Sequence, residues 1–208
     1  MSVDESRDVE RLVVSLRALG GLERLPQWGR ASADYDHMGA KLADAVLQSG
    51  VNYEVFVRPR VDQIAAGLPT ARTTGEFLEL LHRDGPEKIL NLKSGRKLRT
   101  IVELTTFLAD KGVQTTSELR TWLQAGGNAS SLRSVHGVGP KTVSFLKLLV
   151  GLDAIAVDRQ ILRFIKEAGV DVTDPDLVEA ILIKAGEQIG LSGTDVDQLV
   201  WRSMASRT

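Results

Sequence analysis

The sequence contains no cysteine and few aromatic residues. Among its 208 residues it has 0 Cys, and Phe, Trp and Tyr together make up 5%. The lack of cysteine excludes disulfides, thiolate nucleophiles, zinc–cysteine sites and cysteine-ligated iron–sulfur clusters. The scarcity of aromatic side chains means that the hydrophobic core has to be mostly aliphatic. With 43% hydrophobic and 25% charged residues, the composition is that of a folded globular protein and not of a disordered chain.

Long apolar runs are also missing. The segment Met1–Glu10 is polar, which predicts that no signal peptide is present. The longest apolar stretch, Phe145–Ile155, is interrupted by Lys147 and Asp153, so we expect no membrane-spanning segment. From these two observations we expect a cytoplasmic protein.

The net charge of −1 conceals two regions of opposite sign. Between Lys88 and Lys147, ten Lys and Arg stand against three Asp and Glu, which gives a net charge of +7. Between Asp171 and Asp197, seven acids stand against one lysine, which gives −6. The overall charge argues against a uniformly basic protein, but a basic patch in the middle of the chain can still attract a polyanion. We expect the acids near the C-terminus to form a solvated face.

The spacing of the apolar residues predicts an all-α fold of roughly ten helices. Val9–Leu19, for example, has the spacing of an amphipathic helix, which Gly20 ends. No segment has the sustained period-two alternation that predicts a strand. Residues suited to cap a helix precede several of the predicted helices. They are Ser94, Thr115 with Glu118 in capping-box spacing, Asp158, and Asp174 followed by Pro175.

The stretch Val135–Val143 carries the strongest functional signal in the sequence. In it Gly137 and Gly139 flank the apolar Val138, and a proline follows at the start of a helix. Glycine permits a tight turn and the close approach of another backbone, and proline presets the first helical φ. The free amides at the start of the helix can donate to a phosphate oxygen. The pattern predicts a helix–hairpin–helix at about residues 131–150, which binds a nucleic-acid backbone without reading its bases.

Other glycine motifs fit this stretch less well. A Walker loop has glycine directly before its lysine and follows a strand, whereas here Pro140 intervenes. A dinucleotide-binding fingerprint has a glycine where Thr142 stands. An ordinary helix–helix turn remains the alternative on the hairpin alone.

Lys141 and Asp158 are the candidate catalytic residues. Lys141 lies in the first turn of the second hairpin helix, where the positive helix terminus favours the neutral amine. We expect the apolar residues of this helix to face the core and Ser144 to lie on the side of Lys141. Asp158 ends an apolar run directly before the next helix. A neutral amine can displace a base from the sugar C1′ and form a Schiff base, while a carboxylate accepts the proton and offsets the developing positive charge.

Val135–Phe164 resembles the helix–hairpin–helix–Gly/Pro–Asp (HhH-GPD) superfamily of base-excision DNA glycosylases, especially its endonuclease III-like branch. The resemblance lies in the Gly-Val-Gly hairpin, the lysine two residues beyond it, and two apolar residues and an aspartate before a helix. It implies that Lys141 is the nucleophile and Asp158 the shared aspartate of a bifunctional glycosylase with AP-lyase activity. The hairpin residues that it implies in DNA binding are His136, Gly137, Val138, Gly139 and Thr142.

Weaker similarity covers most of the chain and implies two helical lobes with the active site between them. The first lobe is a helical barrel of residues 33–153, which carries the hairpin. The second lobe combines residues 1–32 with residues 154–208.

Two further segments resemble DNA-facing parts of the superfamily. Leu42–Tyr53 is similar to an early barrel helix and the loop that refills the gap left by an extruded base. In that loop we expect Asn52 or Tyr53 to fill the gap. Ile89–Ile101 is similar to a later DNA-facing segment. The basic residues Lys93, Arg96, Lys97 and Arg99 could hold phosphates there, and of these we single out Arg96 and Lys97.

The resemblance also bears on cofactors and partners. Many relatives have a four-cysteine iron–sulfur loop, and because this chain has no cysteine, we expect no iron–sulfur cluster. The histidines lack metal-ligand spacing, so we expect no metal site, although a monovalent cation at the hairpin is compatible with the resemblance. The expected partner is double-stranded DNA with a damaged base or an abasic site, bound by a monomer at the bacterial nucleoid. The alternatives are a non-catalytic helix–hairpin–helix DNA-binding protein, a monofunctional glycosylase and a helical protein-interaction domain.

Overall fold

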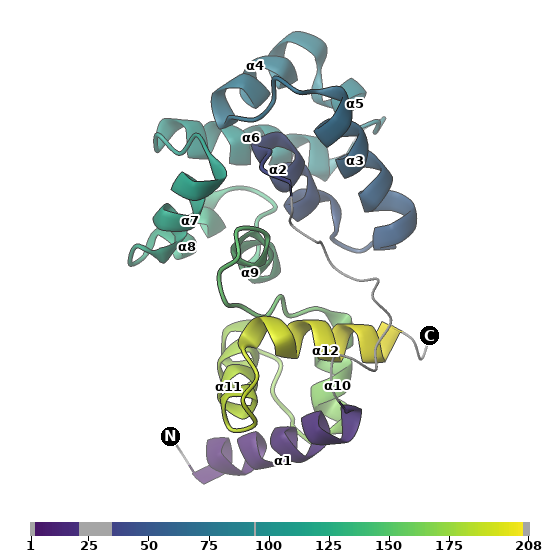
Figure 1. The fold of residues 1–208 in the computed structure, drawn as a ribbon, viewed down its shortest axis with the longest axis vertical. Helices are drawn as coiled ribbons and strands as arrows, with labels where there is room; N and C mark the ends of the chain where they lie inside the picture. The colour runs from purple at the N-terminus through teal and green to yellow at the C-terminus, as the bar shows by residue number, and fades with distance from the viewer. Residues whose placement is uncertain (1–2, 21–34, 94, 206–208) are drawn as a thin grey trace. The chain divides into compact units, whose positions relative to one another are not determined.

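The computed structural model describes residues 3–20, 35–93 and 95–205. Within these ranges the chain forms helices and helical turns and no strand, which confirms the predicted all-α class (Figure 1). The chain divides into two units, one of Met1–Arg30 with Leu152–Thr208 and the other of Ala31–Gly151. The boundary expected between residues 32 and 33 lies outside the described residues.

The unit Ala31–Gly151 is built around helix α2 (Figure 1). This helix packs against α3, α4, α6 and α9, and all ten of its residues are buried. A π-helical turn, Tyr53–Val57, precedes α3, and a 3₁₀ turn, Leu132–Ser134, follows α8. The helices of the unit are α2 (Met38–Leu47), α3 (Arg58–Gly67), α4 (Thr74–Asp84), α5 (Pro86–Ile89), α6 (Arg96–Asp110), α7 (Thr116–Gln124), α8 (Asn128–Ser131) and α9 (Pro140–Leu149).

The central position of α2 follows from its small residues. A Cβ at Gly39 would lie 2.6 Å from Cδ2 of Phe77, so α4 packs directly on the backbone of α2. Ala40, Ala43 and Ala45 are fully buried, so the other faces of the helix also admit close neighbours. The apolar spacing predicts this helix, but not that it is surrounded on all sides.

In the unit that contains the C-terminus, the described residues form four helices. Its helices are α1 (Val3–Leu19), α10 (Arg159–Glu167), α11 (Pro175–Glu187) and α12 (Gly193–Ala205). Helix α12 packs against the other three. Apolar side chains of all four helices form its core, together with Ile155 and Val157 before α10 and Val170 after it. None of the described helices combines the length and the apolar character that a membrane span needs.

Most predicted capping signals are confirmed. Thr115 and Glu118 form a capping box at α7, Asp158 caps α10, and Asp174 caps α11. Ser94 lies outside the described residues, and Gly95 stands at the N-cap of α6.

Candidate functional site

The predicted hairpin is a tight turn between the 3₁₀ turn Leu132–Ser134 and α9. The backbone N–H of Val138 donates to the carbonyl oxygen of Val135 at 3.1 Å, which closes the turn. Val138 is buried, whereas His136 and Gly137 are exposed. The turn is therefore anchored in the core by one apolar side chain and presents its backbone at the surface.

The two hairpin glycines are in different environments. Gly137 has a φ of +82°, and a Cβ there would overlap the hydroxyl of Thr100 in α6. Gly139 has an extended φ of −106°, and a Cβ there would meet nothing within 4 Å. No side chain caps the start of α9, where Gly139 is the N-cap. The fold thus requires glycine at position 137 but not at position 139, where the space beside the helix terminus is open.

Lys141 lies half-buried in the first turn of α9. The apolar residues predicted to face the core are buried, but the prediction for Ser144 is wrong, since that side chain is only 4% exposed. Helix α9 packs against both α2 and the preceding 3₁₀ turn, so its buried face is wider than the apolar spacing indicates. Thr142 is also nearly buried, at 9% exposed, which leaves mainly its backbone amide for any DNA contact.

The two basic residues expected to hold phosphates differ in their surroundings. Arg96 is exposed at the start of α6, and its carbonyl oxygen accepts from the hydroxyl of Thr100 at 3.0 Å. Because Thr100 contacts Gly137, Arg96 lies one helical turn from the hairpin contact. The ammonium of Lys97 instead donates to the carbonyl oxygen of Leu47 at the end of α2. Burial, followed by the charge of Arg60, lowers the pKa of Lys97.

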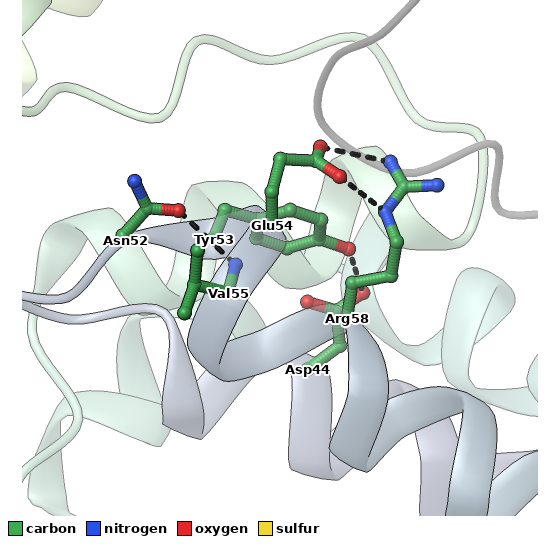
Figure 2. Close-up of polar contacts among 6 residues, drawn as sticks. All are labelled: Asp44, Asn52, Tyr53, Glu54, Val55 and Arg58. Carbon is green, nitrogen blue, oxygen red and sulfur yellow. Dashed lines mark hydrogen bonds and ion pairs between the residues drawn. The ribbon is translucent and has the colours of Figure 1, made fainter.

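The two residues expected to fill a gap in DNA, Asn52 and Tyr53, lie in the loop between α2 and α3 and differ in their exposure (Figure 2). Asn52 is exposed, and its Oδ1 accepts from the backbone N–H of Val55 at 3.1 Å. The phenol of Tyr53 points inward and donates to Oδ2 of Asp44 at 3.0 Å. An ion pair of 2.7 Å between Glu54 and Arg58 also holds the turn. The geometry therefore leaves Asn52, and not Tyr53, at the surface of this loop.

Asp44 is a buried acid that the sequence analysis did not single out. It is 0% exposed, and its Oδ2 accepts from the phenols of Tyr35 at 2.8 Å and Tyr53 at 3.0 Å. Its Oδ1 has no partner among the described residues. Burial raises the pKa of Asp44 to about 6, against the opposing effect of the two phenols and of Lys41 and Arg58. Burial and the neighbouring carboxylate also raise the pKa values of both tyrosines.

Asp44 belongs to a polar stripe on α2. Lys41, Asp44 and Gln48 follow one another at helical spacing on one face of this buried helix. The ammonium of Lys41 donates to the carbonyl oxygen of Leu149 at 2.7 Å, while Nε2 of Gln48 has no partner in the described part of the chain. This spacing of polar residues is visible in the sequence, but it is also that of a solvated helix face, so it does not indicate that the cluster is buried.

Asp158 lies in the unit that contains the C-terminus. Its Oδ1 accepts from the backbone N–H groups of Gln160 at 2.9 Å and Ile161 at 3.1 Å, at the start of α10. Just before it, the backbone N–H of Ala156 donates to Oδ1 of Asp197 at 2.9 Å. The prediction that the C-terminal acids form a solvated face is wrong for Asp197, which is 1% exposed.

The structure thus groups the expected DNA-binding residues around α6 in one unit. The hairpin contacts this helix through Thr100, and Lys97 of the same helix lies 5.1 Å from the ring centroid of Phe56, in the turn that Asn52 caps. Lys141 belongs to this unit and Asp158 to the other, so their joint action stays a prediction.

Neither a metal site nor an ion site is evident in the described part of the chain. No group of three or more His, Asp and Glu side chains is placed there to hold a metal ion. A monovalent cation at the hairpin would use backbone carbonyl oxygens, of which those of Leu132 and Val135 already accept N–H groups. This cation also stays a prediction.

The fold and the site define an all-α protein of two units, one of which carries a tight turn between the 3₁₀ turn Leu132–Ser134 and α9. Residues 12–205 match the model of the family described as a domain of unknown function, DUF8548, and the chain belongs to that family. No curated protein matches the chain. A similar solved structure is the 8-oxoguanine DNA glycosylase of Thermotoga maritima, with a TM-score of 0.53 and 22% sequence identity. The match covers 93% of this chain and 86% of that one, and at this identity it is a likeness of fold.

Proposed function

We propose that the protein is a DNA glycosylase that removes a damaged base from duplex DNA and then cleaves the strand at the abasic site. The observation that carries the proposal is the hairpin, in which Gly139 leaves the start of α9 open while Lys141 lies in the first turn. A helix N-terminus without a side-chain cap offers backbone amides to a phosphate. The likeness of fold to an 8-oxoguanine DNA glycosylase supports the same class of enzyme.

The proposed chemistry begins with Nζ of Lys141 in its neutral form. This nitrogen attacks C1′ of the damaged nucleotide, and the base leaves with the electron pair of the glycosidic bond and takes a proton from water. Asp158 accepts the proton that the attacking amine releases and offsets the positive charge that develops on the sugar. The bond between C1′ and O4′ then breaks as O4′ takes the proton from Asp158, and C1′ and the lysine nitrogen form a Schiff base. The Schiff base loses a proton from C2′ to the hydroxide left by that water, the 3′ phosphate leaves, and hydrolysis of the product restores the lysine.

DNA binding in this proposal uses the side of the unit around α6. The hairpin amides and the exposed Arg96 hold phosphates, which fixes the position of the duplex without reading its sequence. A base must leave the helix before its glycosidic bond can be attacked, and the exposed Asn52 fills the space that it leaves. We propose that a single chain carries out these steps at the nucleoid.

A panel of duplexes tests the proposal. Each duplex carries an oxidised, deaminated or alkylated base or an abasic site, and base release and strand cleavage are assayed separately. We expect release of at least one damaged base and cleavage at the abasic site, both lost in Lys141→Ala. Lys147→Ala, on the same helix, is the matched control and is expected to keep both activities.

The other outcomes of the panel separate the alternatives. Base release without strand cleavage would indicate a monofunctional glycosylase. Salt-sensitive DNA binding without release of any base would indicate a non-catalytic DNA-binding protein. Absence of DNA binding at low salt would contradict the proposal and favour a protein-interaction domain.

A further inference from the structure

The chain that leads into Asp158 is an irregular segment inside the C-terminal unit. Residues 152–158 form neither helix nor strand, and the side chains of Ala154 to Val157 are buried. Buried backbone N–H groups need acceptors, and this segment has no neighbouring strand among the described residues to provide them. Within it, the N–H of Val157 donates to the carbonyl oxygen of Ile155 at 3.0 Å, whereas the N–H groups of Ile155 and Ala156 donate to side chains.

Two carboxylates from different helices supply these acceptors. Oδ1 of Asp197 in α12 accepts from the N–H of Ala156 at 2.9 Å, and Oε1 of Glu179 in α11 accepts from the N–H of Ile155 at 3.2 Å. Asp197 is 1% exposed, and burying a carboxylate is unfavourable unless it is well hydrogen-bonded. A charge-assisted hydrogen bond to a backbone amide is shorter and stronger than a neutral one. The arrangement therefore holds the backbone more firmly than a neutral acceptor would.

Helix α12, which carries Asp197, is itself joined to the same segment. Asp153 accepts from the backbone N–H of Gly193 at 3.0 Å and from that of Thr194 at 2.7 Å, at the start of α12. The segment and α12 are thus linked in both directions, by Asp153 reaching the helix and by Asp197 reaching Ala156. Two such links, close in sequence, restrict the path of the chain that ends at Asp158.

Beyond this path, Asp158 is held by the helix that it caps. Its Oδ1 accepts from the backbone N–H groups of Gln160 and Ile161. The backbone before Asp158 is therefore held by Asp197, and the carboxylate of Asp158 is held by the amides that follow it. We propose that Asp197 is a positioning residue that orients Asp158 by holding the backbone two residues before it. The catalytic consequence of this proposal rests on the proposed function, whereas its structural consequence does not.

Amide hydrogen exchange in the whole protein tests the structural consequence. Exchange at Gln160 and Ile161 reports the capping bond of Asp158, because these amides donate to it. In Asp197→Ala we expect their exchange to become roughly tenfold faster, the size expected for loss of a bond to a charged group. Asp197→Asn keeps an acceptor oxygen, so we expect a smaller change in the same direction, and this variant decides the question if Asp197→Ala does not fold.

Asp174→Ala is the matched control. It removes another capping carboxylate from the same unit, at the start of α11, without touching the segment before Asp158. We expect it to leave exchange at Gln160 and Ile161 unchanged. Unchanged exchange at these two amides in both Asp197 variants would overturn the positioning role, even if the amide of Ala156 exchanges faster.

Base release under single-turnover conditions tests the catalytic consequence, on the damaged duplex that the wild type cleaves. We expect the rate constant to fall roughly ten- to a hundredfold in Asp197→Ala, with DNA affinity unchanged, because small displacements of a catalytic group cost this much. The loss should disappear in an Asp158→Asn background, where there is no carboxylate left to orient. Equal losses in both backgrounds would contradict action through Asp158. An inactive wild-type protein would overturn the proposed function, and the exchange data would still decide the positioning.

Discussion

Gly137 in the hairpin lies directly against Thr100 in α6. The positive φ of Gly137 disfavours any L side chain, and a Cβ there would overlap the Thr100 hydroxyl. Thr100 is 3% exposed, so its side chain has little room to move aside. This contact joins the turn expected to bind DNA to the helix that carries Arg96.

Replacing Gly137 is therefore expected to destabilise the protein. Alanine at a positive φ costs about 1–2 kcal/mol, and the overlap with Thr100 adds to this. We predict that Gly137→Ala lowers the free energy of unfolding by at least about 2 kcal/mol, as measured by urea titration. A stability equal to that of the wild type would show that the turn can move away from α6.

Gly139→Ala, in contrast, is expected to leave the stability unchanged and to weaken DNA binding. Its backbone is extended and its Cβ would enter open space, so we predict a change in the free energy of unfolding within about 0.5 kcal/mol. The same methyl group would occupy the space through which a phosphate approaches α9. We predict roughly tenfold weaker binding to a duplex at fixed salt, the effect of losing a bond to a charged group. Unchanged affinity would contradict phosphate binding at this helix terminus.

Arg96 and Lys97 are expected to respond differently to substitution. Arg96 is exposed, so we predict that Arg96→Ala leaves stability unchanged and reduces the slope of log K for DNA against log salt by about 1. Lys97 holds the carbonyl oxygen of Leu47 inside the unit, so we predict that Lys97→Met destabilises the fold by about 1–2 kcal/mol. Salt titrations of DNA binding and urea titrations of each variant measure the two effects. An unchanged salt slope in Arg96→Ala would remove this residue from the interface.

The burial of Asp44 predicts a pH dependence of stability. Its pKa is raised from 3.8 to about 6, so the folded protein holds this proton more tightly than the unfolded chain does. The stabilisation that protonation gives is complete below about pH 4 and is lost as the pH rises to about 6. We predict that this group lowers the free energy of unfolding by about 3 kcal/mol over that interval. Urea titrations over this pH interval should show no such decrease in the free energy of unfolding for Asp44→Asn. They should still show it for Asp36→Asn, which changes an exposed acid. The same pH profile in Asp44→Asn as in the wild type would contradict the assignment.

The helix starts were the most predictable part of the fold. Capping depends on a side chain and on amides two or three residues away, so Thr115 with Glu118, Asp158 and Asp174 could be identified from local sequence. Helix α3 was not predicted, because Arg58–Gly67 has only two buried apolar residues and therefore little helical periodicity. The π-helical turn before it depends on contacts such as that of Tyr53 with Asp44, between residues on different elements.

The hairpin was predictable because glycine permits a positive φ and proline fixes its own φ, and both effects are local to the residue. The roles of Asp44 and Asp197 were not, since both acids lie on amphipathic helices where a solvated face is the usual position. Only the packing of neighbouring helices distinguishes a buried carboxylate from an exposed one. The same limit explains Ser144, which is buried on a helix that packs against both α2 and the 3₁₀ turn.

Covalent trapping by borohydride tests the central claim most directly. Reduction of a Schiff base between the protein and a duplex with an abasic site fixes the complex covalently, so it can be separated under denaturing conditions. We predict that the wild type and Lys147→Ala form this complex, that Lys141→Ala does not, and that peptide mapping places the link at Lys141. No trapped complex with the wild type, or undiminished trapping with Lys141→Ala, would contradict the assignment of Lys141 as the nucleophile.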